Sequence, residues 1–82
     1  MDWARLVAKV LHPTQVAIIE AMEYFEKPVS AQQLTRSFGD KEYVLSSVAY
    51  HVRSLAERGA VEKVGERQVR GAVENFYALA NS

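Results

Sequence analysis

The chain has 82 residues, ten basic and ten acidic side chains, and no cysteine. A chain of this length forms one small domain, and the lack of cysteine excludes disulfides and thiolate metal sites. The net charge of zero argues against indiscriminate electrostatic binding to nucleic acid, although it is compatible with a local basic patch.

Targeting and membrane signals are weak in this sequence. No apolar run approaches the roughly 20 residues that span a bilayer. The opening stretch MDWARLVAKVL carries charges inside its apolar run and lacks the small-residue cleavage site of a signal peptide. We therefore expect residues 1–82 to form a single cytoplasmic domain that makes no contact with a membrane.

The first expected element is an amphipathic helix over residues 2–11, because its apolar residues recur at helical spacing. This apolar stripe either packs on the core of its own domain or forms the interface with a twofold-related copy. A tryptophan near a terminus is a frequent anchor of such interfaces. The candidate dimer-interface residues are Trp3, Leu6, Val7 and Val10.

Two further helices are expected before residue 40. One covers residues 14–25, after a proline that is tolerated in a first turn. Its apolar stripe consists of Val16, Ile19, Met22 and either Phe25 or Ile18. The next begins at Ser30, which forms a capping-box pattern with Gln33, and stops at Gly39.

The segment DKEYVL, residues 40–45, is expected to be a loop or an irregular extra turn. A fourth helix is then expected over residues 46–58, with Ser46 or Ser47 as its N-cap and Gly59 after its end. Its inner stripe consists of Val48, Val52 and Leu55.

The period changes in residues 60–79, which are rich in valine and aromatic residues and contain two glycines. This pattern predicts a β-hairpin with strands near 60–66 and 72–79 and a tip within 68–71. The register stays open, because the adjacent Phe76 and Tyr77 cannot both face the core.

The predicted fold class is mainly α with a small β-hairpin, in the order helix, helix, short helix, helix, hairpin. This is the layout of a winged helix-turn-helix, with the helix-turn-helix over residues 30–59 and the wing over residues 60–79.

Four stretches resemble ArsR-like bacterial repressors over roughly residues 11–79. They are LHPTQVAIIEAM before and within the first core helix, VSAQQLTRSFG in helix two, SSVAYHVRSLAERGAVE in the recognition helix, and FYAL at the end of the wing. The resemblance implies a DNA-binding winged helix, usually dimeric and usually a transcriptional regulator. Metal-sensing members use cysteines or histidine–carboxylate clusters, and this sequence has neither pattern. The connection before the recognition helix is also longer than the family's usual one.

The exposed face of the helix over 46–58 provides the main candidate DNA contacts. At 100° per residue, hydroxyl, tyrosine and arginine side chains lie opposite the inner stripe. Such groups contact phosphates and base edges, and a recognition helix inserts its N-terminal half into the major groove. The candidates are Ser46, Ser47, Tyr50, His51, Arg53 and Ser54.

Each of these candidates also has a structural interpretation. The face as a whole could be an ordinary solvated surface, and His51 could form hydrogen bonds within the domain. In the wing, Arg67, Gln68 and Arg70 are candidates for contacts with phosphates or a minor groove. Their alternative role is solubilising charge.

The leading hypothesis is therefore a small, sequence-specific transcriptional regulator that binds double-stranded DNA as a homodimer. The alternative is a winged-helix adaptor that binds another protein, since fold does not fix function. We expect no enzymatic activity, metal or cofactor, because the sequence lacks a phosphate-binding glycine loop, a nucleophile elbow and metal-ligand spacing.

Overall fold

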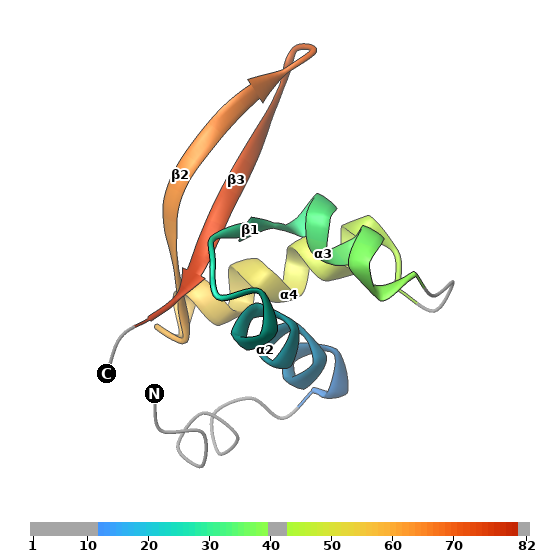
Figure 1. Cartoon of the computed structure of the whole chain (residues 1–82), viewed down its shortest axis with the longest axis vertical. Coiled ribbons are helices and arrows are strands. Elements are labelled where there is room, and N and C mark those ends of the chain that lie inside the picture. Colours follow the sequence, from blue (N-terminus) through green and yellow to red (C-terminus); the bar gives the residue numbers. More distant parts are fainter. Residues whose placement is uncertain (1–11, 40–42, 81–82) are drawn as a thin grey trace.

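The computed structural model describes residues 12–39 and 43–80. Three helices pack together beside one end of a three-stranded sheet, and a long hairpin projects away from them (Figure 1). This is the winged-helix arrangement that the sequence predicts. The predicted helix over residues 2–11 lies outside the described residues. The elements are α2 (Pro13–Phe25), β1 (Val29–Ser30), α3 (Ala31–Phe38), α4 (Leu45–Glu57), β2 (Val61–Val69) and β3 (Ala72–Leu79).

Helix α2 begins and ends with side-chain and backbone caps. The Nδ1 atom of His12 accepts a hydrogen bond from the backbone N–H of Thr14 at 3.1 Å, and Pro13 occupies the first turn, where its missing N–H costs nothing. At the other end, Glu26 takes a left-handed conformation (φ 57°) and donates its N–H to the carbonyl of Met22. The predicted helix over 14–25 is thus confirmed.

Helix α3 contains the capping box that the sequence predicts. The hydroxyl of Ser30 accepts from the N–H of Gln33 at 3.1 Å, and the side-chain oxygen of Gln33 accepts from the N–H of Ser30 at 3.1 Å. Gly39 ends the helix with a positive φ of 60°, a conformation that glycine adopts without steric cost. These two ends fix the helix at eight residues.

The start of α4 differs from the prediction. The helix begins at Leu45 with Val44 as its N-cap, and no side chain caps it. The prediction that Ser46 or Ser47 caps the helix was therefore wrong. The carbonyl of Val44 accepts the first intrahelical hydrogen bond from Val48 at 3.0 Å, so the backbone alone sets this end.

The end of α4 agrees with the prediction that Gly59 stops this helix. The N–H of Ala60 donates to the carbonyl of Leu55 at 2.9 Å, and the N–H of Gly59 donates to Ala56 at 3.1 Å. Gly59 has a φ of 79°. This pair of bonds with a left-handed glycine is a Schellman motif, which satisfies the last carbonyls of the helix.

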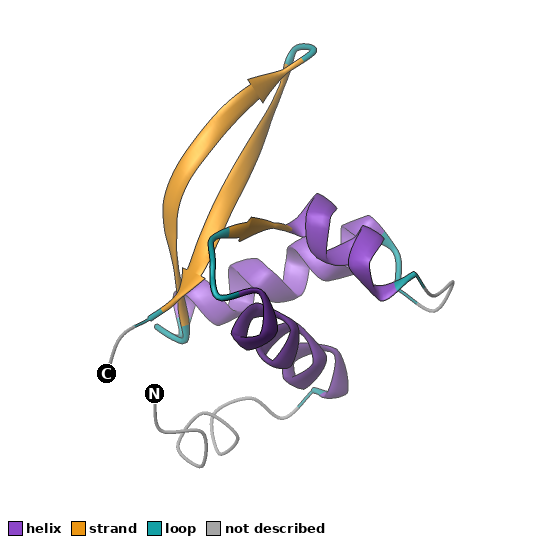
Figure 2. Ribbon diagram, viewed as in Figure 1, coloured by secondary structure: helices purple, strands orange, loops and turns teal. Residues whose placement is uncertain are grey.

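The sheet is antiparallel in the order β1-β3-β2 (Figure 2). Strand β1 was not predicted, because two residues leave no periodic signal. It pairs Val29 with Tyr77 and Ser30 with Phe76. Strand β2 continues to Val69, three residues beyond its predicted end.

The hairpin turn consists of Arg70 and Gly71, within the predicted tip. Their φ angles are 49° and 82°. Positive φ at both central residues is the mark of a type I′ turn, whose twist matches that of the flanking strands.

A bulge near the base of β2 determines which way the outer side chains point. Lys63 pairs with Tyr77 and Gly65 pairs with Phe76, so Val64 is an extra residue. Tyr77 is 8% exposed and belongs to the core, whereas Phe76 is half-buried and, by strand alternation, lies on the opposite face of β3. The structure thus resolves the register that the sequence left open.

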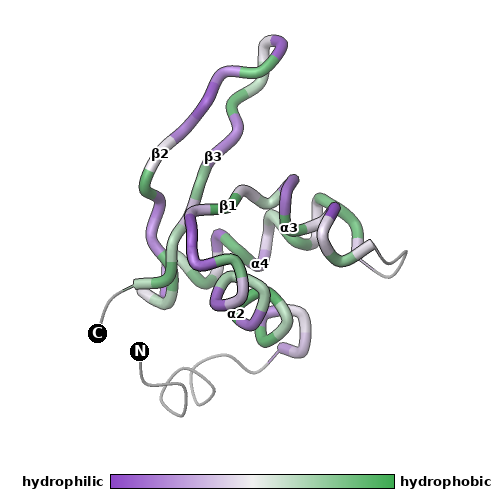
Figure 3. Tube along the Cα trace, viewed as in Figure 1, coloured by the Kyte–Doolittle hydropathy of each residue, from purple (hydrophilic) through white to green (hydrophobic). Residues whose placement is uncertain are grey.

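The core lies where α2, α3 and α4 meet the base of the sheet. The predicted inner stripe of α4, Val48, Val52 and Leu55, is at most 1% exposed. Hydrophilic residues gather instead along the outer part of β2 (Figure 3). In α2 the fully buried residues are Ile18 and Ile19, with Met22 beside them, while Val16 and Phe25 are only partly buried.

No helix among residues 12–39 and 43–80 is long and apolar enough to cross a membrane.

We predict that Ser30→Ala lowers the free energy of unfolding by about 2 kcal/mol. The substitution removes the cap of α3 and a buried hydrogen-bond partner of Glu74. Urea denaturation followed by circular dichroism measures the change. Ser37→Ala is the matched control in the same helix, because the Ser37 hydroxyl is exposed and donates only to the carbonyl of Leu34. Equal stability of the two variants would contradict the prediction.

Candidate nucleic-acid interface

The wing is attached to the helices through a buried carboxylate on β3. Glu74 is 5% exposed. Its carboxylate accepts one hydrogen bond from the hydroxyl of Ser30 and another from the guanidinium of Arg67, the latter at 2.6 Å. These bonds, that of Ser30 first, hold the pKa of Glu74 below its usual value, because they favour the charged form.

Arg67 lies on the same face of the wing as Glu74 and Phe76. Glu74 is its cross-strand partner, and its guanidinium carbon lies 5.5 Å from the centre of the Phe76 ring. The sequence predicted Arg67 as a nucleic-acid contact, and its side chain is still 60% exposed. Its charge, however, is already compensated by an acid that the sequence did not indicate.

The other face of the wing presents different residues. Because side chains alternate along a strand, Val73, Asn75 and Tyr77 point away from the Glu74 side. Gln68 pairs with Val73 and shares that second face. Arg70 is exposed in the turn at the hairpin tip. The three predicted wing residues therefore lie on two faces and the tip, rather than on one surface.

The outer face of α4 carries the other predicted contacts. Ser46, Tyr50 and Arg53 are exposed, while Ser47 and Ser54 are half-buried. The side chain of Tyr50 is 61% exposed. Along α4 the single acidic residue is Glu57, at the C-terminal end. The first two turns therefore offer hydroxyls and a tyrosine without a carboxylate, followed by one arginine.

His51 forms contacts within the domain, which was the alternative interpretation of this residue in the sequence. It is 9% exposed. Its Nδ1 atom lies 3.2 Å from the side-chain nitrogen of Gln15, and its ring centre lies 4.2 Å from that of His12. Burial, and then the nearby His12, lower the pKa of His51. The predicted DNA contact at His51 is thus replaced by packing between α4 and α2.

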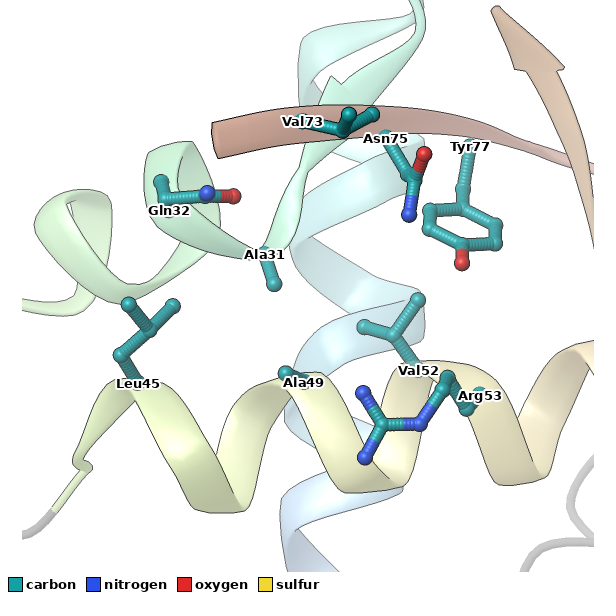
Figure 4. A pocket seen from close by; sticks show the side chains of 9 residues that line it. All are labelled: Ala31, Gln32, Leu45, Ala49, Val52, Arg53, Val73, Asn75 and Tyr77. Carbon is teal, nitrogen blue, oxygen red and sulfur yellow. The ribbon is translucent and has the colours of Figure 1, made fainter. Parts of the chain in front are cut away.

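A groove of about 180 Å³ separates α4 from β3 and the start of α3. Figure 4 shows the guanidinium of Arg53 along its α4 side, with the Asn75 amide and the Tyr77 hydroxyl descending from β3. Among residues 12–39 and 43–80, no carboxylate lines this groove. The lining residues are Ala31, Gln32, Leu45, Ala49, Val52, Arg53, Val73, Asn75 and Tyr77.

Sequence reasoning missed Asn75, Tyr77 and Glu74 as residues of this region. The signal that could have found them is the alternation along β3, which assigns Asn75 and Tyr77 to one face and Glu74 to the other. That alternation becomes informative only when one face is known to lie against α4.

The fold and the groove can be compared with known families. The family model of the ribonuclease R winged-helix domain matches residues 16–72. The chain belongs to this family. The match extends from α2 through the turn of the wing, so it includes all of α4 and β2.

Membership in the ribonuclease R winged-helix family supports the predicted winged helix. The finer resemblance to ArsR-like repressors stays a prediction. No curated protein matches the chain. Within the described residues, no group of three or more histidine, cysteine or acidic side chains is placed to hold a metal ion.

The histidine pair gives a pH-dependent prediction. The pKa of His51 is lowered in the folded state, so the His51 ring binds a proton less readily in the folded protein than in the unfolded chain. The contribution of the neutral ring to the free energy of unfolding is therefore complete above the unfolded pKa of about 6.5 and is lost as the pH falls below it.

His12→Asn tests the second cause of the shift. Asparagine retains a side-chain oxygen that can cap α2 but removes the charge beside His51. We expect the pKa of His51 to rise in this variant yet to stay below its usual value, because burial persists. Nuclear magnetic resonance of the imidazole nitrogens measures both values. An unchanged pKa of His51 would contradict the assigned role of His12.

Proposed function

We propose that this protein binds double-stranded DNA through α4 and its wing. The observation that carries the proposal is the exposed, acid-free face of α4 from Ser46 to Ser54, beside a hairpin with a cationic tip at Arg70. A helix of this kind fits the major groove, where side chains of its N-terminal half reach base edges.

The open start of α4 favours the same use. No side chain that the structure describes caps its first N–H groups, and Leu45 and Ser46 are exposed. Uncapped N–H groups at a helix N-terminus bind phosphate readily. In this arrangement, the N-terminus contacts the backbone, Ser46 and Tyr50 face the bases, and Arg53 follows one turn later.

We also propose a biological role, a small ArsR-like transcriptional regulator in the cytoplasm that acts without enzymatic activity, metal or cofactor. The resemblance in the sequence supports this role. Because the net charge is zero, a single domain gains little affinity from non-specific electrostatic attraction to DNA. A homodimer would double the contacts and match the symmetry of a twofold operator.

A protein-binding adaptor is the second candidate. It is favoured by the apolar exposure at the start of α4, where Val44 is 54% and Leu45 44% exposed. The wing cations Lys63 and Arg67 also form ion pairs with Glu66 and Glu74, which reduces the positive charge available for phosphates.

The DNA proposal is tested by selection from randomised duplexes, followed by fluorescence anisotropy at two salt concentrations. We expect affinity to fall with salt. Tyr50→Ala and Arg53→Ala should each weaken the selected duplex by about 1–3 kcal/mol. Tyr24→Ala is the matched control, because Tyr24 is 83% exposed on α2 and should leave the affinity unchanged.

The outcomes separate the candidates. Because the matched family takes its name from a ribonuclease, RNA of the selected sequence is included as a competitor, in double- and single-stranded form. Tighter binding to RNA than to DNA would contradict the DNA proposal and identify RNA as the ligand. Absence of salt-dependent binding to any nucleic acid would contradict the proposal and leave the adaptor.

The homodimer is tested separately by sedimentation velocity. We expect a dimer at micromolar concentration and a dimer Kd raised about tenfold or more in Trp3→Ala, as expected for an aromatic anchor. A monomer for the unsubstituted protein at these concentrations, or a Kd unaffected by the substitution, would contradict the predicted interface at Trp3, Leu6, Val7 and Val10.

A further inference from the structure

We propose that the groove between α4 and β3 holds a backbone phosphate of the duplex bound by α4, with Asn75 and Tyr77 as phosphate-binding residues beside Arg53. This proposal rests on the proposed function and adds two residues of the wing strand to it. It makes the recognition helix and the wing two sides of one phosphate site.

The first argument is the convergence of hydrogen-bond donors from two elements. In Figure 4, the Asn75 amide nitrogen and the Tyr77 hydroxyl point from β3 toward α4, and the Arg53 guanidinium lies along the opposite wall. Arginine, asparagine and tyrosine side chains all donate to phosphate oxygens in complexes with DNA. A tetrahedral anion between these walls can accept from more than one of them.

The second argument is electrostatic. In the part of the chain that the structure describes, the groove has one charged lining residue, the cation Arg53, and no carboxylate. Glu66 on β2 is the cross-strand partner of Asn75, and Glu74 precedes Asn75 on β3, but each of these carboxylates binds a cation. Glu74 lies on the other face and binds Arg67 and Ser30, and the carboxylate of Glu66 binds the Lys63 ammonium at 2.7 Å. The groove therefore favours an anion.

The third argument is the state of Asn75. Its side-chain oxygen is buried and has no hydrogen-bond partner, an arrangement that costs stability. An apolar residue would avoid this cost between Val73 and Tyr77. The unpartnered oxygen is an acceptor, as phosphate oxygens are, so it is the nitrogen of the same amide, which faces the groove, that would donate to a phosphate.

A phosphate in this groove would position the protein on the duplex. Phosphate contacts fix register and orientation but do not read sequence. With the backbone held between Arg53 and β3, Tyr50 and Ser46, one and two turns earlier, would be placed against base edges. Substitution of Asn75 or Tyr77 should therefore weaken binding to all duplex sequences by the same factor.

The experiment measures binding of Asn75→Ala, Asn75→Asp and Tyr77→Phe to the selected duplex and to an unrelated duplex. We expect Asn75→Ala and Tyr77→Phe to weaken both duplexes by the same factor, about tenfold. Asn75→Asp, which adds a negative charge to the groove, should weaken them more. Tyr24→Phe is the matched control for the tyrosine, and melting temperatures verify that each variant is folded.

Neutral methylphosphonate linkages, introduced one at a time, locate the contact. One position should weaken binding of the unsubstituted protein more than it weakens binding of Asn75→Ala, because that variant has already lost one of the contacts with this phosphate while it keeps Arg53. Strictly additive effects at every position would overturn the proposal. So would variants that bind as tightly as the unsubstituted protein, while the proposed DNA binding itself would stand.

Inorganic phosphate distinguishes a free anion from the backbone. Chemical shifts of the Asn75 side-chain amide that saturate with phosphate, combined with unchanged duplex binding in the variants, would show an anion site unrelated to DNA and would overturn the proposal. If the protein binds no duplex at all, both the proposed function and this inference fall together.

Discussion

The buried carboxylate of Glu74 accepts hydrogen bonds from Ser30 and from Arg67, and it thereby links β3 of the wing to the start of α3. Ser30 is at the same time the N-cap of α3 and a residue of β1. One side chain thus belongs to a helix cap, a strand pair and a buried ionic contact. The hairpin projects far beyond the core from this junction (Figure 1).

The two faces of the hairpin have separate roles as a result. The face with Glu74, Arg67 and Phe76 compensates its own charge and stiffens the wing, since a guanidinium over an aromatic ring and beside a carboxylate is held on both sides. The face with Asn75 and Tyr77 lies toward α4, and Glu66, the acid opposite Asn75, forms an ion pair with Lys63. The anion site that we propose is compatible with a net charge of zero, because Glu74 points to the opposite side of β3 and Glu66 is neutralised by Lys63.

Much of this fold follows from local sequence signals. The Ser30 capping box, the left-handed glycines at 39 and 59, and the inner stripe of α4 each depend on short-range spacing, and each is confirmed. The start of α4 at Leu45 was missed, because a valine N-cap uses only backbone atoms and leaves no side-chain signal. Strand β1 is too short for a period, and its existence depends on the distant β3.

The candidate site was predicted less completely than the fold. Alternation counted from the buried Val61 would assign Arg67 to the face toward α4, and the bulge at Val64 reverses this assignment. His51 lies at the edge of the helical stripe, where burial is decided by Gln15 and His12 on another helix. The proposed contacts of Ser46, Tyr50 and Arg53 remain predictions, although the structure does leave these side chains exposed.

The bulge also determines where the hairpin tolerates a change in length. Val64 is the residue in excess, so the loss of one residue there would leave every pair from Gly65 to Val69 opposite its present partner. The loss of one residue between Glu66 and Val69 would instead turn side chains over or displace the Arg70–Gly71 turn, whose positive φ angles suit few other residues. Insertions and deletions in this wing should therefore be tolerated at its base and selected against toward its tip.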